Sequence, residues 1–319
     1  MTTENILIQV DQVSRFYGSL RAVDDISFEV KKGEVLGFLG PNGAGKSTTM
    51  QILSGNLAPS AGRVRICGID LLDQPKQAKA LLGYLPDQPP LYRELTVDEY
   101  LLYCARLNRI PAAQRRSALD VAKQRCGLTE VGRRLIGNLS KGYRQRVGIA
   151  QAIIHSPAVV ILDEPTVGLD PIQIREIREL IRELRDEHSV ILSTHILPEV
   201  QAVCDRVQII NKGRMVLTDT IGGLQQRMRG ESLWLTMRQA PELAALEKIV
   251  GAGQVEALGE GHFRIHTEQL EQLAERIVLE AVANDWGLYE IRPERMSLEQ
   301  IFVDITTSEY GVDAERAVS

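Results

Sequence analysis

The chain has 319 residues, of which 44% are apolar and 25% charged, and its net charge is −5. This length predicts about two domains of ~150 residues each, and the composition is ordinary for a soluble globular protein. The negative charge argues against a surface that coats nucleic acid, so we expect no nucleic-acid partner. The sequence has no apolar run of the ~18–20 residues that cross a bilayer and no signal-peptide pattern at its start. Any membrane role therefore requires a partner.

The first elements predicted along the chain are two half-buried strands, at residues 5–13 and 21–30, where apolar and polar residues alternate. Between them stands an aromatic residue, Tyr17, upstream of a glycine-rich loop. An exposed ring at this place is able to stack on the adenine of a nucleotide. A strand-end aromatic that only packs is an equally good interpretation, and the residues alone leave both open.

A short apolar run at 35–39 predicts a buried strand, and the residues after it match the phosphate-loop pattern G-x-x-x-x-G-K-[ST]. Three glycines allow the backbone amides to form an anion-binding nest. The start of a helix over 47–53 and the charge of Lys46 add to it, and Ser47 offers a hydroxyl to Mg²⁺. The candidate nucleotide-binding residues here are Gly40, Pro41, Asn42, Gly43, Ala44, Gly45, Lys46, Ser47 and Thr48.

A helical block follows, from about residue 95, and opens with a capping box at Thr96 and Glu99. Inserted helices continue to about 137, and the whole helical subdomain is predicted to span about 95–157. Its last helix begins after Ser140, which we expect to be the N-cap. That helix start is a second candidate anion site, formed by the Ser140 hydroxyl and the Gly142 amide. Ser140 acting only as a cap is the alternative.

Two adjacent carboxylates, Asp163 and Glu164, come directly after a continuous apolar strand at 158–162. The carboxyl ends of buried parallel strands are where open α/β sheets bind ligands. Because side chains alternate along a strand, the two carboxylates point in different directions. We expect Asp163 to hold Mg²⁺ and Glu164 to orient and deprotonate a water molecule. Such a pair is usually a solvated strand end, but the phosphate loop favours function here.

Asp170 and Pro171 predict the start of the next helix, with Asp170 as its N-cap. A buried strand at 189–193 then leads to His195. A lone histidine is more often structural, but this one is expected at the same sheet edge as Asp163 and Glu164. It is therefore a candidate for contact with the terminal phosphate. Residues 207–217 predict a hairpin with its tip at 211–213.

The last hundred residues predict a separate small α+β domain. After a polar linker at 225–230, we expect the order strand, helix, strand, strand, helix, strand between 232 and 292, which is typical of a ferredoxin-like fold. A helix is predicted at 297–306, so the accessory domain covers 231–308 and a flexible tail covers 309–319. This domain shows no catalytic constellation and is interpreted as a regulatory or interaction module.

Together these motifs resemble the ATP-binding subunits of ABC transporters, over residues 5–220 and in the family's order. Residues 40–48 resemble Walker A, 139–143 the signature loop, 159–164 Walker B, 168–171 the D-loop, and His195 the switch histidine. The amino-acid sequences of the signature and Walker B segments look closest to those of single-cassette subunits of bacterial exporters. The resemblance implies an α/β P-loop cassette over 1–224, with a mixed core sheet, an antiparallel N-terminal β part and the inserted helical subdomain.

The resemblance also implies a mechanism with ATP and Mg²⁺. Two cassettes, this chain and a second copy or a homologue, pair head to tail around two ATP molecules and drive a separate membrane permease from the cytoplasmic face. Tyr17 stacks on adenine, Lys46 binds the β- and γ-phosphates, and His195 senses the γ-phosphate. The residues that approach the ATP of the partner chain belong to the signature loop and the D-loop: Ser140, Lys141, Gly142, Tyr143 and Asp170.

The sequence departs from the family's pattern at three places. Asp87 stands where the Q-loop glutamine is expected, with Gln88 one position later; its negative charge near the γ-phosphate leaves the coupling role open. Lys141 replaces a glycine of the signature and Tyr143 replaces its glutamine. Lys141 adds charge toward the phosphate, so we expect the site to work.

Two other functions are compatible with a cassette. A soluble ABC ATPase acting on ribosomes or DNA usually carries two cassettes with a charged linker, whereas this chain has one set of motifs, no internal repeat and a negative charge. A non-catalytic nucleotide-binding module would not need both Glu164 and His195. The exporter subunit is therefore the leading hypothesis.

Overall fold

The computed structural model describes residues 5–227, 229–251, 254–267 and 269–295. The chain divides into two compact units between Ile221 and Gly222. They are called here the N-terminal unit and the C-terminal unit, and each is described by itself.

The N-terminal unit contains a six-stranded sheet with the order β10-β9-β3-β8-β7-β6. Strands β9, β3, β8, β7 and β6 are parallel, and β10 pairs antiparallel with β9. Every residue of β3, β7 and β8 is buried, as their continuous apolar sequences predict. The strands are β3 (Val35–Leu39), β6 (Leu82–Leu85), β7 (Val159–Asp163), β8 (Ser189–Thr194), β9 (Arg206–Asn211) and β10 (Arg214–Thr220).

A second, antiparallel sheet of the same unit has the order β2-β1-β4-β5. Its strands are β1 (Ile6–Tyr17), β2 (Leu20–Lys31), β4 (Ala61–Ile66) and β5 (Ile69–Asp70). Helix α1 (Lys46–Leu53) packs between this sheet and the parallel one, because its apolar side chains join one core with strands of both sheets. The predicted mixed core with an antiparallel N-terminal part is confirmed.

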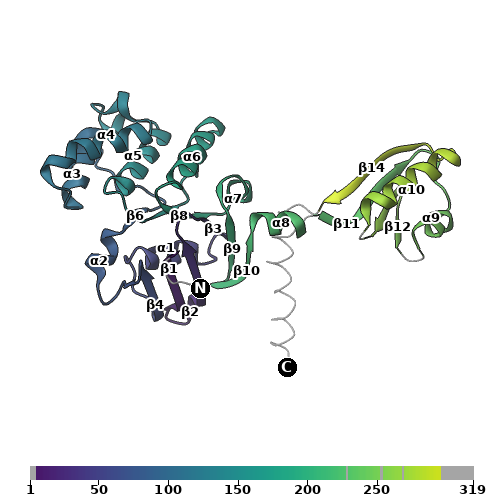
Figure 1. Cartoon of the computed structure of the whole chain (residues 1–319), viewed down its shortest axis with the longest axis horizontal. Coiled ribbons are helices and arrows are strands. Elements are labelled where there is room, and N and C mark those ends of the chain that lie inside the picture. The colour runs from purple at the N-terminus through teal and green to yellow at the C-terminus, as the bar shows by residue number, and fades with distance from the viewer. Residues whose placement is uncertain (1–4, 228, 252–253, 268, 296–319) are drawn as a thin grey trace. The chain divides into compact units, whose positions relative to one another are not determined.

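The inserted helices α3 (Val97–Leu107), α4 (Arg115–Arg125) and α5 (Lys141–Ile153) lie together (Figure 1). The predicted capping box is present at the start of α3: the Thr96 hydroxyl accepts a hydrogen bond from the Glu99 amide, and the Glu99 carboxylate accepts one from the Thr96 amide. A 3₁₀ turn at Ala112–Gln114 directly precedes α4. Two further 3₁₀ turns occupy Thr129–Val131 and Ile136–Asn138.

Strand β6 and helices α2 (Pro75–Ala80) and α7 (Leu197–Val203) have no counterpart among the predicted elements. All three are short, and two of them carry a proline in the first turn, so hydrophobic periodicity gives little signal. The position of β6 matters for function, because it pairs with β7 and brings the segment after Leu85 to the carboxyl edge of the sheet. The unit is completed by α6 (Pro171–Leu184), and α8 (Ile221–Arg227) follows β10.

The C-terminal unit is a four-stranded antiparallel sheet with the order β12-β13-β11-β14. Its elements are β11 (Arg229–Met237), α9 (Leu243–Val250), β12 (Val255–Gly259), β13 (His262–His266), α10 (Leu270–Ala283) and β14 (Leu288–Arg295). Both helices contribute to one core with the same sheet face. The predicted βαββαβ order is therefore observed, and the strand order is that of a ferredoxin-like fold.

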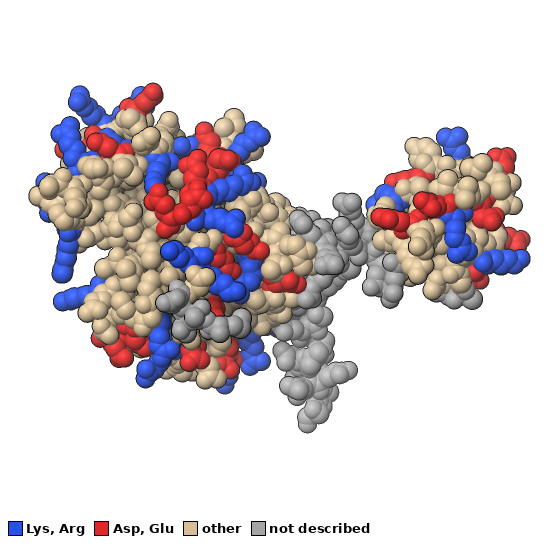
Figure 2. All heavy atoms as spheres, viewed as in Figure 1, with Lys and Arg blue, Asp and Glu red and all other residues tan. Residues whose placement is uncertain are grey.

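Predictions at the end of the chain meet the structure only in part. The expected linker, 225–230, falls on the end of α8 and the first residues of β11 rather than on a segment without secondary structure. The helix expected at 297–306 and the tail at 309–319 lie outside the described residues. On the face that Figure 2 shows, acidic and basic side chains are interspersed over the described residues.

Candidate functional site

The phosphate loop leaves the buried strand β3 and enters α1. Gly43 and Gly45 have φ angles of 80° and 108°, in the left-handed region that favours glycine. A Cβ on Gly45 would lie 2.4 Å from the Ala22 carbonyl oxygen, so no larger residue fits. The loop therefore places backbone amides and the start of α1 around one point, which is the geometry of an anion site.

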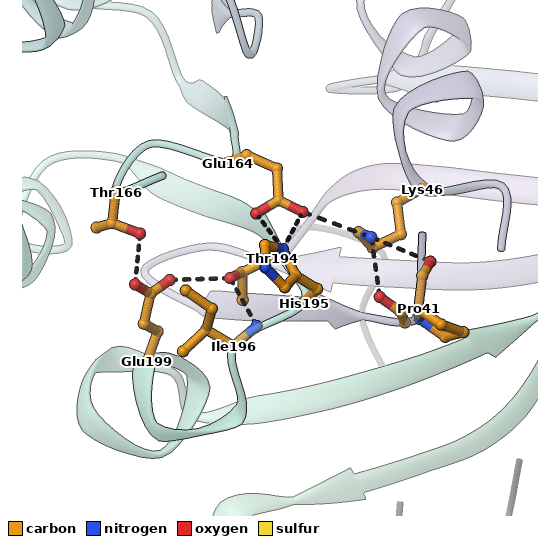
Figure 3. Close-up of polar contacts among 9 residues, drawn as sticks. Pro41, Lys46, Glu164, Thr166, Thr194, His195, Ile196 and Glu199 are labelled. Carbon is orange, nitrogen blue, oxygen red and sulfur yellow. Dashed lines mark hydrogen bonds and ion pairs between the residues drawn. The ribbon is translucent and has the colours of Figure 1, made fainter. Parts of the chain in front are cut away.

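Lys46 places its ammonium group between the phosphate loop and Glu164. It is buried, and its Nζ donates hydrogen bonds to the carbonyl oxygens of Gly40, at 2.8 Å, and Pro41, at 3.3 Å. The same Nζ lies 3.4 Å from Glu164 Oε1 (Figure 3). A positive charge is thus held beside the amides that would bind phosphate.

Asp163 ends β7 and is 2% exposed. Burial raises the pKa of its carboxyl group, while the neighbouring hydroxyl groups of Ser193 and Ser47 act in the opposite direction. One oxygen, Oδ1, is buried and makes no hydrogen bond within the part of the chain that the structure describes. An acceptor of this kind has a ligand or ion as its natural partner.

The oxygen atoms of Asp163 and Ser47 are suitable ligands for a Mg²⁺ ion. Magnesium takes oxygen ligands and usually receives only one or two from the protein, the rest coming from water and phosphate. The Asp163 carboxylate and the Ser47 hydroxyl are neighbouring oxygen ligands of this type. Among the described residues no group of three or more His, Cys, Asp or Glu side chains could hold a metal.

Glu164 follows Asp163 with a φ of 49°, and its amide donates a hydrogen bond to the Ser193 carbonyl at 2.9 Å. The carboxylate accepts hydrogen bonds from Nδ1–H of His195, at 3.1 Å to Oε1 and 3.0 Å to Oε2. The Glu164 side chain is 10% exposed and that of His195 41%. A sheltered carboxylate and an accessible imidazole therefore meet at the ends of β7 and β8, as the sequence predicts for their positions.

A cavity of about 650 Å³ lies over these groups. It brings together residues from the phosphate loop, both strand ends and the segment after β6. Its lining residues are Tyr17, Leu20, Arg21, Ala22, Asn42, Gly43, Gly45, Lys46, Ser47, Thr48, Asp87, Glu164, Val167, His195 and Lys212.

Tyr17 ends β1, because that strand runs four residues beyond the predicted boundary at 13. The residue is 46% exposed and lines the cavity. The Arg15 guanidinium lies 4.7 Å from the ring centroid and covers part of it. A partly open aromatic surface at the cavity mouth is compatible with adenine stacking.

Asp87, which replaces the expected glutamine, follows β6 and lines the same cavity. Its negative charge is one of the influences that raise the pKa of Asp163. Gln88 is exposed and is not among the residues that line the cavity. The residue at the family's glutamine position, and not the next one, therefore faces the phosphate site.

The signature loop, residues 139–143, lies apart from this cavity. Ser140 is the N-cap of α5, as predicted, and its hydroxyl accepts a hydrogen bond from the Tyr143 amide at 3.3 Å. A Cβ on Gly142 would come within 2.6 Å of the Gln173 side chain, and one on Gly168 within 2.3 Å of Lys141 Nζ. The loop thus packs beside the start of α6, where Asp170 is the N-cap. Residues 140–143 and Asp170 do not line the cavity.

Comparisons with known proteins identify the family to which this chain belongs. The model of the family described as "ABC transporter" matches residues 23–167. The bacitracin transport ATP-binding protein BcrA of Bacillus licheniformis is 33% identical over 301 residues, which are 94% of this chain and 97% of that protein. The chain belongs to the ABC transporter family.

Two further ABC proteins show how far the likeness extends. The linearmycin resistance ATP-binding protein LnrL of Bacillus subtilis is 31% identical over 94% of this chain and 98% of its own length. The solved structure of CbiO1 from Clostridium perfringens, part of the ABC transporter complex CbiONQ, matches with a TM-score of 0.64 and 30% identity. It covers 69% of this chain and 91% of that chain.

The predicted family and cassette fold are therefore confirmed. The chain is the ATP-binding subunit of an ABC transporter, and the alternative of a soluble factor acting on ribosomes or DNA is set aside. None of the helices described in this ABC subunit is long and apolar enough to cross a membrane.

One buried polar group of this ABC cassette, Glu199, is not among the residues that the sequence predicts. Glu199, in the first turn of α7, is 1% exposed and accepts hydrogen bonds from the hydroxyls of Thr166 and Thr194. Its only sequence signal is an acidic residue among apolar ones in a short helix. The partner Thr166 lies 33 positions away, so no local pattern identifies the contact.

Proposed function

We propose that this chain hydrolyses ATP and that Glu164 is the general base. The observation that carries the proposal is the position of Glu164, whose carboxylate contacts both Lys46 and His195 at the cavity. A base of this kind must lie beside the phosphate that reacts and must be held in orientation. The phosphate loop supplies the first condition and His195 the second.

In the proposed reaction, the oxygen of a water molecule attacks the γ-phosphorus of ATP. Glu164 accepts the proton of that water, the bond from the γ-phosphorus to the β–γ bridging oxygen breaks, and ADP and phosphate leave. Lys46 and the loop amides neutralise the charge that develops on the phosphate oxygens. Ser47 and Asp163 would hold Mg²⁺, which would supply further charge neutralisation. Tyr17 supports the adenine by stacking.

We further propose that two cassettes complete each site between them. Ser140 and Gly142 begin a helix, which suits an anion, yet they lie outside the cavity that contains Lys46. A second copy of the chain, or a homologous cassette, placed head to tail would bring its signature loop to the phosphate in that cavity. The arrangement gives the signature residues a ligand that their own chain does not offer.

The printed names of the relatives support a transport role with a separate membrane permease, and we propose export as its direction. BcrA and LnrL are named for bacitracin transport and linearmycin resistance, and CbiO1 for its place in a transporter complex. The chain would then act at the cytoplasmic face of the membrane. Co-expression tests this assignment: the chain should enter the membrane fraction with its permease and leave it when the permease is omitted.

Replacement of Glu164 by Gln tests the proposed hydrolysis. The variant keeps the size of the side chain but loses the base, so kcat should fall by at least ~10²-fold. With ATP and Mg²⁺ it should accumulate as a nucleotide-bound dimer, measured by size-exclusion chromatography with light scattering. Turnover equal to that of the unsubstituted chain would remove Glu164 from this role.

A further inference from the structure

Glu199 has a carboxylate that lies inside the N-terminal unit and outside the nucleotide cavity. Its Oε1 accepts a hydrogen bond from the Thr166 hydroxyl, and its Oε2 accepts one from the Thr194 hydroxyl at 2.9 Å. Figure 3 shows the carboxylate between the two threonines. Burying a charged group is unfavourable unless it is hydrogen-bonded, so both contacts are needed to keep this carboxylate where it is.

Both threonines adjoin residues to which we assign hydrolysis. Thr166 lies two positions after Glu164, and Thr194 directly precedes His195. The two threonines are 2% and 0% exposed, so neither has water as an alternative partner. Glu199 therefore joins the segment that follows β7 to the end of β8 at the place where each carries a reacting group.

The hydrogen-bond directions in this cluster are fixed. A carboxylate only accepts hydrogen bonds, so each threonine hydroxyl must donate its one hydrogen to Glu199. The Thr194 oxygen also accepts a hydrogen bond from the Ile196 amide at 3.0 Å, which ties the turn after β8 to the same group. A glutamine in place of Glu199 has one oxygen and one NH₂ group, so it cannot accept from both hydroxyls in this way.

We propose that Glu199 is a positioning residue for ATP hydrolysis. By holding Thr166 and Thr194 together, it sets the spacing of the two strand ends and keeps the Glu164 carboxylate 3.0–3.1 Å from His195 Nδ1. The inference rests on the proposed function, because it assigns Glu199 an effect through Glu164 and His195. A misplacement of ~1 Å in reacting groups costs on the order of 10²-fold in rate.

The test compares Glu199→Gln, Thr166→Val and the double variant in steady-state ATP hydrolysis. Each single variant should lower kcat by about 10- to 100-fold. KM for ATP and the Kd of a fluorescent ATP analogue should change by less than about threefold, since none of these residues lines the cavity. The double variant should be no slower than the slower single variant, because both substitutions break the same contact, the hydrogen bond between Thr166 and Glu199.

A matched control and a stability measurement separate positioning from folding. Glu183→Ala removes an exposed carboxylate from α6 and should leave kcat unchanged. Thermal unfolding identifies any variant that is not folded at the assay temperature. If Glu199→Gln is such a variant, Thr166→Val, which preserves the shape of the side chain, tests the inference in its place. Folded variants that keep kcat, or that raise KM alone, would overturn the inference.

The outcome also distinguishes this inference from the proposed function. If Glu164→Gln abolishes hydrolysis while the Glu199 and Thr166 variants match the unsubstituted chain, the base assignment stands and the positioning role fails. If the unsubstituted chain with Mg²⁺ does not hydrolyse ATP, the proposed function fails and the inference falls with it.

Discussion

The two edges of the six-stranded sheet both carry polar side chains, but they use them differently. At the amino edge, the Ser189 hydroxyl accepts a hydrogen bond from the Gly33 amide at 2.9 Å and donates one to the Lys31 carbonyl at 2.8 Å. The Asp205 carboxylate there accepts a hydrogen bond from the Val35 amide, also at 2.9 Å. These side chains bond to the backbone of neighbouring strands and loops.

At the carboxyl edge the polar side chains face a cavity instead. Glu164 contacts both Lys46 and His195, and all three residues line it. Asp163 retains a buried oxygen without a hydrogen bond among the described residues. Side chains that bond only to backbone, as at the amino edge, stabilise the fold, whereas groups that contact one another or remain available to a ligand carry out chemistry. Changes at the carboxyl edge should therefore affect activity, and changes at the amino edge stability.

The largest effect is expected from variants that damage the two halves of the proposed composite site. Lys46→Ala removes the phosphate-binding ammonium group, and Gly142→Asp places a negative charge in the signature loop. Each purified variant should retain less than ~1% of the activity, as expected when charge stabilisation is lost. An equal mixture should recover activity up to about a quarter, because half of the dimers are mixed and each mixed dimer has one intact site.

The matched control for that mixture pairs Lys46→Ala with a chain that carries both substitutions. No dimer of these chains contains an intact site, so no activity should return. Sites completed within a single chain would give no recovery in either mixture, and the head-to-tail arrangement would be wrong.

The sequence predicts the carboxyl edge far better than the contacts that support it. The phosphate loop, Asp163 and Glu164 each follow a short apolar run, so local sequence places them at strand ends. The strand β6 carries little periodic signal in its four residues, so the position of Asp87 at the cavity was given only by family resemblance. The contacts of Glu199 with Thr166 and of Lys141 with Gly168 join distant segments. They depend on tertiary packing that no local pattern encodes.

A smaller effect, on stability alone, is expected at Asp205. Asp205→Ala leaves the Val35 amide without its acceptor at a residue that is 0% exposed, which costs about 1–3 kcal/mol. The Asp205–Arg185 ion pair is too exposed to add much. The thermal midpoint should fall by about 3–10 °C with kcat unchanged. Asp205→Asn retains an acceptor oxygen and should fall less; an equal fall would show that the hydrogen bond is not the cause.

The smallest effect concerns the pH dependence of stability at His188, beside the amino edge. Its Nδ1–H donates to the Pro157 carbonyl at 2.6 Å, and burial lowers its pKa below the ordinary value of 6.5. Burial likewise lowers the pKa of His155. Below pH 6.5 the unfolded chain binds more protons at these groups than the folded chain does, so their contribution to stability is present above that pH and is lost as the pH falls.

The expected result is a free energy of unfolding that declines between about pH 7 and about pH 5.5, with a slope of at most about 1.4 kcal/mol per pH unit for each histidine. His188→Asn keeps a donor for the Pro157 carbonyl and cannot be protonated, so it should remove the share of the slope that belongs to His188. Thermal unfolding across this range measures it. An unchanged slope would place the His188 proton equilibrium at its ordinary value in the folded chain, and the amino edge would then be less sheltered from solvent than its burial indicates.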